Sequence, residues 1–417
     1  MTLFQIVALF LALIGVAGWI NTRFLHWPSA TVMVLAGGLN AGTLLLLHRY
    51  FPAGGAGRVI AAVVGVDFPQ AVLGYMLGFL LFAGAMQVDL SELRRRRLAV
   101  WTLATLGVLA STAIVGGGLW LAARLLGLQL SLPWACVFGA LISPTDPIAV
   151  LAAVRDGKLS KLLEVVLQGE ALFNDGVGIV IFTAALTIAS GGANLNPMAA
   201  VGQVAIQALG GLAFGLAAGW LAIRVIGMID DYAVEVTLSL ALAAGVYAVA
   251  QALGISGPIA VVAAGLLMGD AGLKAAMSET TQRHVREFWT LIDEILNALL
   301  FMLLGLEVLV IPFDLRMAGL WGAALVLVLA ARFAVVMPWG AYFQDREGQR
   351  HAGLVLGWGG LHGALSLAMA LSVPRGPAQG LILSTTFAVV VFSIVVQGLT
   401  FGKVAAWHAG AGIARSP

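Results

Sequence analysis

Two short polar segments interrupt otherwise apolar stretches of this chain. The first reads SPTDP at residues 143–147. Its prolines remove backbone donors and disfavour helical geometry at the preceding residues, so several carbonyl groups lose their helical partners. Ser143, Thr145 and Asp146 add side-chain oxygen atoms at the same point. Because a proline kink alone needs no carboxylate, we interpret these residues as candidate ligands for an ion or a proton.

The second segment reads GEALFNDG at residues 169–176. On a helix, Glu170 lines up with Asn174, whereas Asp175 lies on a different face. A buried carboxylate without a partner tends to take up a proton, whereas one beside a buried cation stays ionised. Charged groups are costly in an apolar surround and are seldom there for packing alone. We therefore predict that Asp175 binds an ion or a proton.

Arg332 is the basic residue that falls near the middle of an expected span. A guanidinium at that depth requires a buried anion, and Glu170 is the predicted partner. This pairing would leave Asp175 free to titrate. The alternative is that Arg332 extends its side chain toward the membrane surface.

The glycine-rich segment GWGGLHGALS, residues 357–366, contains His362. A histidine in such a place is either a hydrogen-bonded structural group or a titrating one, and both roles stay open. By contrast, Asp293 and Glu294 fall near the expected start of an apolar stretch. An interfacial position is sufficient to explain these two acids.

The composition is that of a polytopic membrane protein. Of 417 residues, 61% are hydrophobic and 10% are charged, and the mean hydropathy is +1.00. These values lie far outside the soluble globular range. Apolar runs of roughly 18–25 residues, the length that crosses a bilayer, fill almost the whole sequence. The first run follows no basic residue and precedes no cleavage signal, so it is interpreted as a span.

We expect an all-α fold of about thirteen transmembrane helices. The predicted spans are 3–20, 30–48, 70–89, 98–124, 132–154, 162–189, 198–226, 232–253, 256–270, 286–311, 316–340, 350–372 and 379–405. The intervening segment 49–69 is too short and broken to span, and is expected to be interfacial or re-entrant. Lys and Arg gather on one side of this topology, which puts the N-terminus outside and the C-terminus in the cytoplasm.

The hydropathy pattern also suggests two halves of inverted topology. One set of five consecutive spans ends near residue 189 and a second set of five ends near residue 405, with two helices between the sets. The fourth span of the first half carries SPTDP, and the fourth of the second carries GWGGLHGALS. Interrupted spans at corresponding places in two halves are a strong sequence sign of a transport site near the midplane.

Other chemistries leave no recognisable sign in the sequence. We find no nucleotide-binding loop, no His and Cys metal cluster and no nucleophile with a base. The RRRR run at 94–97 is interpreted as a stop-transfer cluster that contacts membrane lipids, not as a nucleic-acid site. We therefore expect no cofactor, no nucleic-acid partner and no enzymatic activity.

Several motifs in order carry a family resemblance. TDP at 145–147, GExLxNDG at 169–176, a later span with Arg332 and GGLxGALS at 359–366 together resemble the monovalent cation/proton antiporters. The chain is most similar to the NhaP-type sodium/proton antiporters, which are related to the sodium/hydrogen exchangers. The likeness covers most of the chain, including HVREFWTLIDEILNALLFMLLGLEV at 284–308.

This resemblance implies a fold with inverted repeats, two crossing broken helices, and a homodimer in a prokaryotic inner or plasma membrane. It divides the chain between a dimerisation domain and a mobile transport domain. The expected parts are dimerisation helices at 1–97, the first half of the transport domain at 98–190, a linker helix with further dimerisation helices at 191–311, and the second transport half at 312–417.

The resemblance also implies roles for single residues. Asp175 matches the essential ion- and proton-binding aspartate, and Asp146 matches the aspartate of the TDP motif. Asn174 and Thr145 match residues that hold the unwound segment near the site. The two residues paired above match a structural ion pair. An Asn-Asp pair at 174–175 is associated in the family with electroneutral exchange.

Three positions depart from the family pattern. Ala171 stands where the family usually has Ser, and Ala83 stands where it often has Glu. His362 replaces the Arg of a usual GLRGA segment. These changes bear on cation selectivity and pH profile, but they leave Asp175 unaffected.

The expected function is therefore exchange of a monovalent cation for protons. Na⁺ is the first expectation, with Li⁺ and K⁺ as alternatives, and Asp175 and Thr145 are its expected ligands. An ion channel would also use broken helices and carbonyl oxygens. An intramembrane aspartyl protease, with Asp146 and Asp175 as its dyad, is a more remote alternative.

Overall fold

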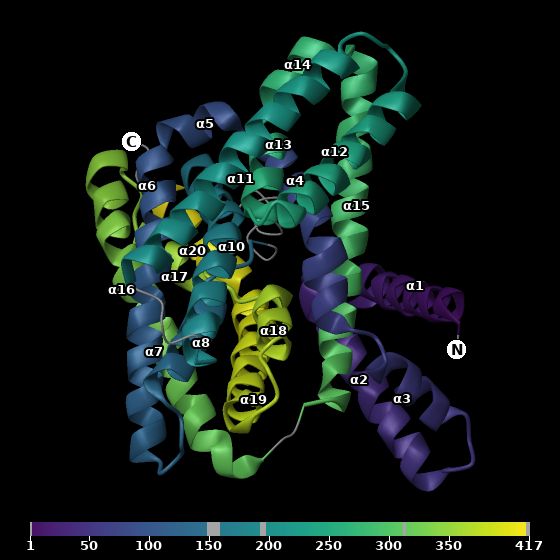
Figure 1. Ribbon diagram of the computed structural model, residues 1–417, viewed down its shortest axis with the longest axis vertical. Coiled ribbons are helices and arrows are strands. Elements are labelled where there is room, and N and C mark those ends of the chain that lie inside the picture. The colour runs from purple at the N-terminus through teal and green to yellow at the C-terminus, as the bar shows by residue number, and fades with distance from the viewer. Residues whose placement is uncertain (1, 148–158, 192–196, 312–313, 414–417) are drawn as a thin grey trace.

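Helices account for nearly the whole chain in the computed structural model, which describes residues 2–147, 159–191, 197–311 and 314–413 (Figure 1). No strand occurs within these described ranges. Nine helices of the described part are long and apolar enough to cross a membrane. The prediction of an all-helical polytopic membrane protein is confirmed, while the total of thirteen spans stays a prediction.

The N-terminal half contains helices of very different lengths. They are α1 (Leu3–Ile20), α2 (Ser29–Tyr50), α3 (Ala56–Val64), α4 (Leu77–Gln87), α5 (Leu90–Arg95), α6 (Arg97–Thr102), α7 (Val108–Leu125), α8 (Leu132–Ile142) and α10 (Lys161–Ala189). Short π-helical turns extend some of them, at η1 (Asn21–Leu25), η2 (Gln70–Met76) and η3 (Leu103–Gly107). Because η3 joins α6 to α7, residues 97–125 form one membrane-length helix.

The C-terminal half follows the same pattern. Its helices are α11 (Pro197–Ile226), α12 (Tyr232–Ala252), α13 (Gly257–Leu267), α14 (Leu273–Ala276), α15 (Glu279–Leu306), α16 (Ala318–Glu347), α17 (Ala352–Trp358), α18 (Ala364–Leu371), α19 (Pro377–Phe392) and α20 (Gly398–Ile413). The turns between them are η4 (Met268–Gly272), η5 (Glu307–Leu309), η6 (Leu315–Met317) and η7 (Ser393–Gln397).

The observed helices depart from the predicted spans mainly at their ends. α15 begins at Glu279, seven residues before the predicted 286, because Ser278 accepts a hydrogen bond from the backbone N–H of Thr281 and caps a charged first turn. The segment predicted as interfacial contains the nine-residue helix α3, which has no buried residue and no side-chain cap. The start of α15 thus shows that a capped helix can begin before its apolar stretch.

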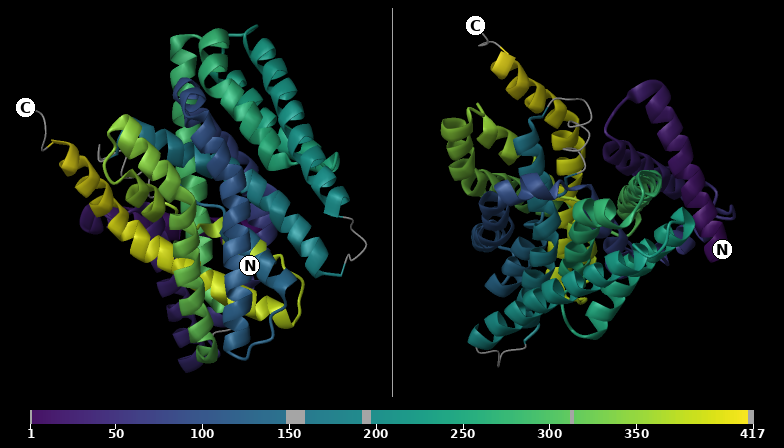
Figure 2. Two further views of the ribbon diagram at one scale, coloured as in Figure 1. Left: turned by 90° about the vertical axis from the view of Figure 1, so that its left-hand side faces the viewer. Right: turned by 90° about the horizontal axis from the view of Figure 1, so that it is seen from above.

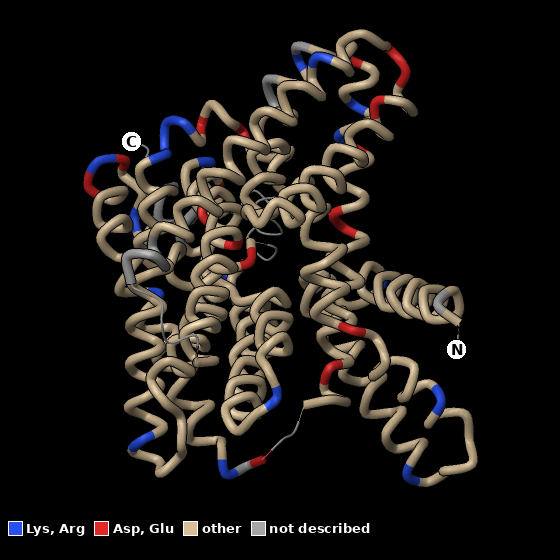
Figure 3. Tube along the Cα trace, in the orientation of Figure 1, with Lys and Arg blue, Asp and Glu red and all other residues tan. Residues whose placement is uncertain are grey.

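The long helices pack in two groups. In one, α7 packs against α8 and α16, α10 packs against α8, and α17 to α20 lie alongside. In the other, α15 packs along α2 and α4, and α13 packs on α4 and α11 (Figures 1 and 2). Charged residues are more frequent at the end that carries α5 and α14 and at the opposite end than in the belt between them (Figures 1 and 3). This arrangement fits a bundle that spans a bilayer.

Helical structure is lost at both places where the sequence predicts an interruption. α8 ends at Ile142, and residues 143–147 run without helix up to the limit of the described segment; the remainder of the predicted span, 148–154, lies outside the described residues. α17 ends at Trp358 and α18 begins at Ala364, so residues 359–363 separate them. The first break contains two prolines and the second contains three glycines, residues that leave helical geometry readily.

Candidate functional site

The two breaks meet directly at the centre of the bundle. The backbone N–H of Asp146 donates to the carbonyl of Leu361 at 2.7 Å, in an isolated antiparallel bridge. The ring Nδ1 of His362 lies 3.2 Å from the carbonyl oxygen of Pro144. Because a carbonyl only accepts, this contact requires a proton on Nδ1. Each break thus supplies a donor to a carbonyl group of the other: the backbone N–H of Asp146 from the first and the ring of His362 from the second.

His362 is held on its own side as well. Its backbone N–H donates to the hydroxyl of Ser393 at 2.9 Å, and that hydroxyl donates to Gln397 at 2.7 Å. The side chain is 4% exposed. The structure therefore places His362 as a link between the breaks; its titration stays a prediction.

Gly363 of the second break lies against Asp146 of the first. A Cβ atom added there would overlap the Asp146 carboxylate. Gly360, three residues earlier, lies against the guanidinium of Arg332 in the same way. The glycines of this segment are therefore required by space, because the backbone passes next to two charged side chains.

We expect Gly363→Ala to displace Asp146 and loosen the junction of the breaks. Overpacking of this kind costs about 1–3 kcal/mol, since neither the backbone nor the carboxylate can yield freely. The measurement is the apparent melting temperature of the purified protein, together with its transport rate. Gly322→Ala is the matched control, because a Cβ at that α16 position meets nothing within 4 Å. Equal behaviour of the two variants would contradict the close approach.

Asn174 joins α10 to the first break. Its side-chain nitrogen donates to the hydroxyl of Thr145 at 2.9 Å, and both residues are buried. Ser143 is placed differently, because its hydroxyl donates to the carbonyl of Gly139 at 2.6 Å and lies 3.2 Å from the hydroxyl of Thr112. Thr145 is thus held beside Asn174, while the Ser143 hydroxyl is engaged with its own helix and with α7.

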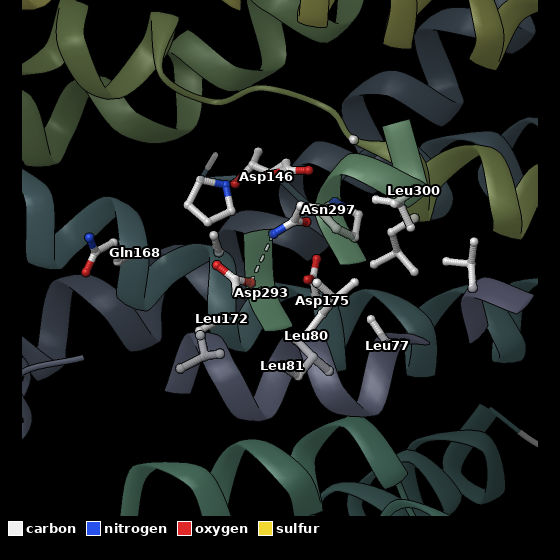
Figure 4. Close-up of a pocket in the computed structure, with 18 of the residues that line it drawn as sticks. Leu77, Leu80, Leu81, Asp146, Gln168, Leu172, Asp175, Asp293, Asn297 and Leu300 are labelled. Atoms are coloured by element: carbon white, nitrogen blue, oxygen red, sulfur yellow. Dashed lines mark hydrogen bonds between the residues drawn. The ribbon is translucent and has the colours of Figure 1, made fainter. Parts of the chain in front are cut away.

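Asp175 borders a cavity of about 120 Å³ that lies between α4, α10, α15 and the breaks (Figure 4). Its side chain is partly exposed, in contrast to the fully buried Asn174 beside it. Thr145, Asp146 and Gly363 border the same cavity from the breaks. The structure therefore brings together Asp175, Thr145 and Asp146 around one space, whereas Ser143 does not line it.

The departures from the family pattern fall in different places. Ala171 lines the cavity one turn before Asp175, so this wall presents a methyl group where a hydroxyl was expected. Ala83 is fully buried in α4 and does not line the cavity. On this side, the cavity is consequently poorer in side-chain oxygen atoms than the family pattern implies.

Glu170 and Arg332 form a buried ion pair. Both nitrogens of the Arg332 fork donate to the two carboxylate oxygens of Glu170, the second at 2.9 Å. The guanidinium also donates twice to the carbonyl of Leu356, at 2.9 and 3.1 Å. Arg332 is 6% exposed and Glu170 is 2% exposed, so the arginine does not extend to the membrane surface. The pair fastens α10 to α16 and α17.

Asp293 and Asn297 of α15 also line the cavity. From the sequence, Asp293 was expected only at the membrane interface. The Asn297 amide donates to the Asp293 carboxylate at 2.9 Å. Figure 4 shows the carboxylates of Asp293 and Asp175 pointing into the same space from different helices. The spacing of 293, 297 and 300 on one helix face was the available signal, since Leu300 lines the cavity too.

Comparisons with known proteins agree with this architecture. The profile of the sodium/hydrogen exchanger transmembrane family matches residues 6–407. The Na⁺/H⁺ antiporter NhaP of Pseudomonas aeruginosa is 41% identical over 408 residues, covering 96% of both chains. The Na⁺/H⁺ antiporter NhaH of Halobacillus aidingensis is 36% identical and covers 81% of this chain and 83% of its own. The structure of the sodium proton antiporter MjNhaP1 from Methanocaldococcus jannaschii superimposes with a TM-score of 0.72 at 19% identity, covering 97% of this chain and 99% of that one.

Proposed function

The chain belongs to the sodium/hydrogen exchanger family, and from this we propose that it exchanges Na⁺ for protons across the membrane. The observation that carries the proposal is the position of Asp175. This carboxylate reaches a cavity at the junction of two broken helices, next to Thr145 and the backbone around it. The relatives named for Na⁺/H⁺ antiport support Na⁺ as the first cation to test, with Li⁺ and K⁺ as alternatives.

Competition for Asp175 is sufficient to couple the two ions. A carboxylate that holds a proton cannot at the same time hold a cation, so each site carries one or the other. Thr145, Asp146 and the carbonyl groups freed at the first break replace part of the water that surrounds the cation. Asn174 keeps Thr145 in place through its amide. Lowering the pH on one side therefore raises the Na⁺ concentration needed to fill the site from that side.

Neutralisation of Asp175 permits the site to change sides. Moving an uncompensated charge through a low-dielectric barrier is costly, whereas a carboxylate with a bound proton or cation crosses at a much smaller cost. The empty form is therefore held on one side. With Asp175 as the one carboxylate that exchanges its proton, and an amide neighbour at 174, one cation replaces one proton, and we propose that the exchange is electroneutral.

The movement itself is proposed as an elevator-like displacement of one helix group past the other. Residues 98–190 and 312–417 would form the mobile transport part, which includes both breaks and α10. Residues 1–97 and 191–311 would form the dimerisation part, with a linker helix, in a homodimer. The C-terminus is proposed to lie in the cytoplasm, on the side where most of the Lys and Arg residues gather.

Transport by purified protein in liposomes tests this proposal. With the membrane potential clamped, a Na⁺ gradient is expected to drive proton movement in the opposite direction at a rate that the clamp voltage does not change. Repeating the assay with Li⁺ and K⁺ over a pH series fixes the cation. Large uncoupled currents would indicate a channel, and cleavage of a membrane peptide would indicate a protease; either result would overturn the exchange.

A further inference from the structure

The wall of the cavity opposite α10 carries a carboxylate in addition to Asp175 and Asp146. Asp293 and Asn297 lie one turn apart on α15, and the amide of Asn297 holds one oxygen of Asp293 at 2.9 Å. Both side chains are partly buried and border the space that Asp175 enters (Figure 4). An amide that donates to a carboxylate fixes its rotamer, so Asp293 is oriented on the cavity side of its helix.

The two carboxylates belong to different helix groups. α10, which carries Asp175, packs on α8 and is tied to α16 by the pair of Glu170 and Arg332. α15, which carries Asp293, packs along α2 and α4. A cation between Asp175 and Asp293 therefore bridges the two groups of helices.

The α10 wall of the cavity supplies few oxygen ligands for a cation, so further ligands must come from other walls. Hard monovalent and divalent cations prefer several oxygen ligands, above all carboxylates, carbonyls and amides. Ala171 contributes none to the cavity, and Asn174 is turned toward Thr145. Asp293 and Asn297 are the oxygen-bearing side chains that α15 supplies on the opposite wall.

We propose that Asp293, positioned by Asn297, is a further ligand for the monovalent cation that Asp175 binds, and that it acts in one of the two conformations only. The inference rests on the proposed exchange, in which α10 moves relative to α15. In the conformation described here the two carboxylates share a cavity. After displacement of α10, Asp175 takes its cation away from Asp293, so the two faces of the membrane present sites of different composition.

The test compares cation affinity on the two faces. Na⁺/H⁺ exchange is measured in right-side-out and in everted membrane vesicles, with Na⁺ varied on the outer side of each. Asp293→Asn is expected to raise the half-saturating Na⁺ concentration about tenfold on one face and to leave the other unchanged, because only one conformation loses a ligand. Asn297→Ala should also raise the half-saturating Na⁺ concentration on that face. Asp293→Glu should retain much of the Na⁺ affinity of the unaltered protein.

The matched control is Glu294→Gln, since Glu294 is exposed on the same helix and does not line the cavity. It should leave both faces unchanged. The inference is overturned if Asp293→Asn leaves the half-saturating Na⁺ concentration unaltered on both faces, or changes it equally on both. Failure of the proposed function is a different result, because the unaltered protein would then show no Na⁺/H⁺ exchange.

Discussion

Replacing Asp175 by Asn is expected to abolish Na⁺/H⁺ exchange while leaving the fold intact. The amide occupies the same volume and keeps a polar group at the cavity, so the packing of α10 has no reason to change. It cannot carry a proton in exchange for a cation, and it removes the charge that attracts the cation. The loss should be complete, because no other group on α10 lines the cavity with a carboxylate.

The measurement is the initial rate of Na⁺/H⁺ exchange in liposomes, with the apparent melting temperature as the check on folding. Glu164→Gln is a suitable control on the same helix, since Glu164 pairs with Lys161 at 3.0 Å near the start of α10, where a surface pair contributes little. Exchange at the unaltered rate in Asp175→Asn would remove Asp175 from the mechanism. A variant that fails to fold would be replaced by Asp175→Ser, which is smaller and uncharged.

Replacing Arg332 by Met is expected to give the largest loss of stability of any single change considered. Removal of one member of a buried ion pair leaves an uncompensated charge and costs about 3–5 kcal/mol. Here the loss also strands the carbonyl of Leu356, which accepts two bonds from the guanidinium. A fall of the apparent melting temperature in detergent, compared with the unaltered protein, reports this loss.

The double variant Glu170→Gln with Arg332→Met separates the two contributions. Removing both charges eliminates the stranded carboxylate, so most of the lost stability should return even though the pair is absent. A double variant as unstable as Arg332→Met alone would show that the carbonyl of Leu356 or the packing matters more than the charge. Lys is not an equivalent replacement for Arg332, because it lacks the planar fork that meets both oxygens of Glu170.

The parts of this site that could be predicted from the sequence are residues that are unusual within apolar membrane helices. Prolines inside an apolar run, a carboxylate beside them and a single arginine in mid-span each cost free energy unless something balances them. A guanidinium at that depth requires a buried anion, and this requirement made Glu170 the predicted partner of Arg332. The interruptions at 143–147 and 359–363 followed from the same logic.

The remaining parts depend on tertiary arrangement. An acid near the expected start of a span, such as Asp293, is ordinarily interfacial, and nothing in the sequence says that α15 and α10 line the same cavity. The direction of the Ser143 hydroxyl likewise depends on Thr112 of a neighbouring helix. Helix ends such as the start of α15 depend on caps, which extend a helix past its apolar stretch.

The bridge between Asp146 and Leu361, with the contact of His362 to Pro144, has a mechanical consequence. Two chain segments more than two hundred residues apart are hydrogen-bonded to each other at residues where neither is helical. In the proposed exchange, displacement of one of these segments would displace the other as well, and the residues that surround the ion would move together. The relative movement would then occur across the cavity that α10 and α15 both line, so the ion would meet different residues there while its own ligands stay assembled.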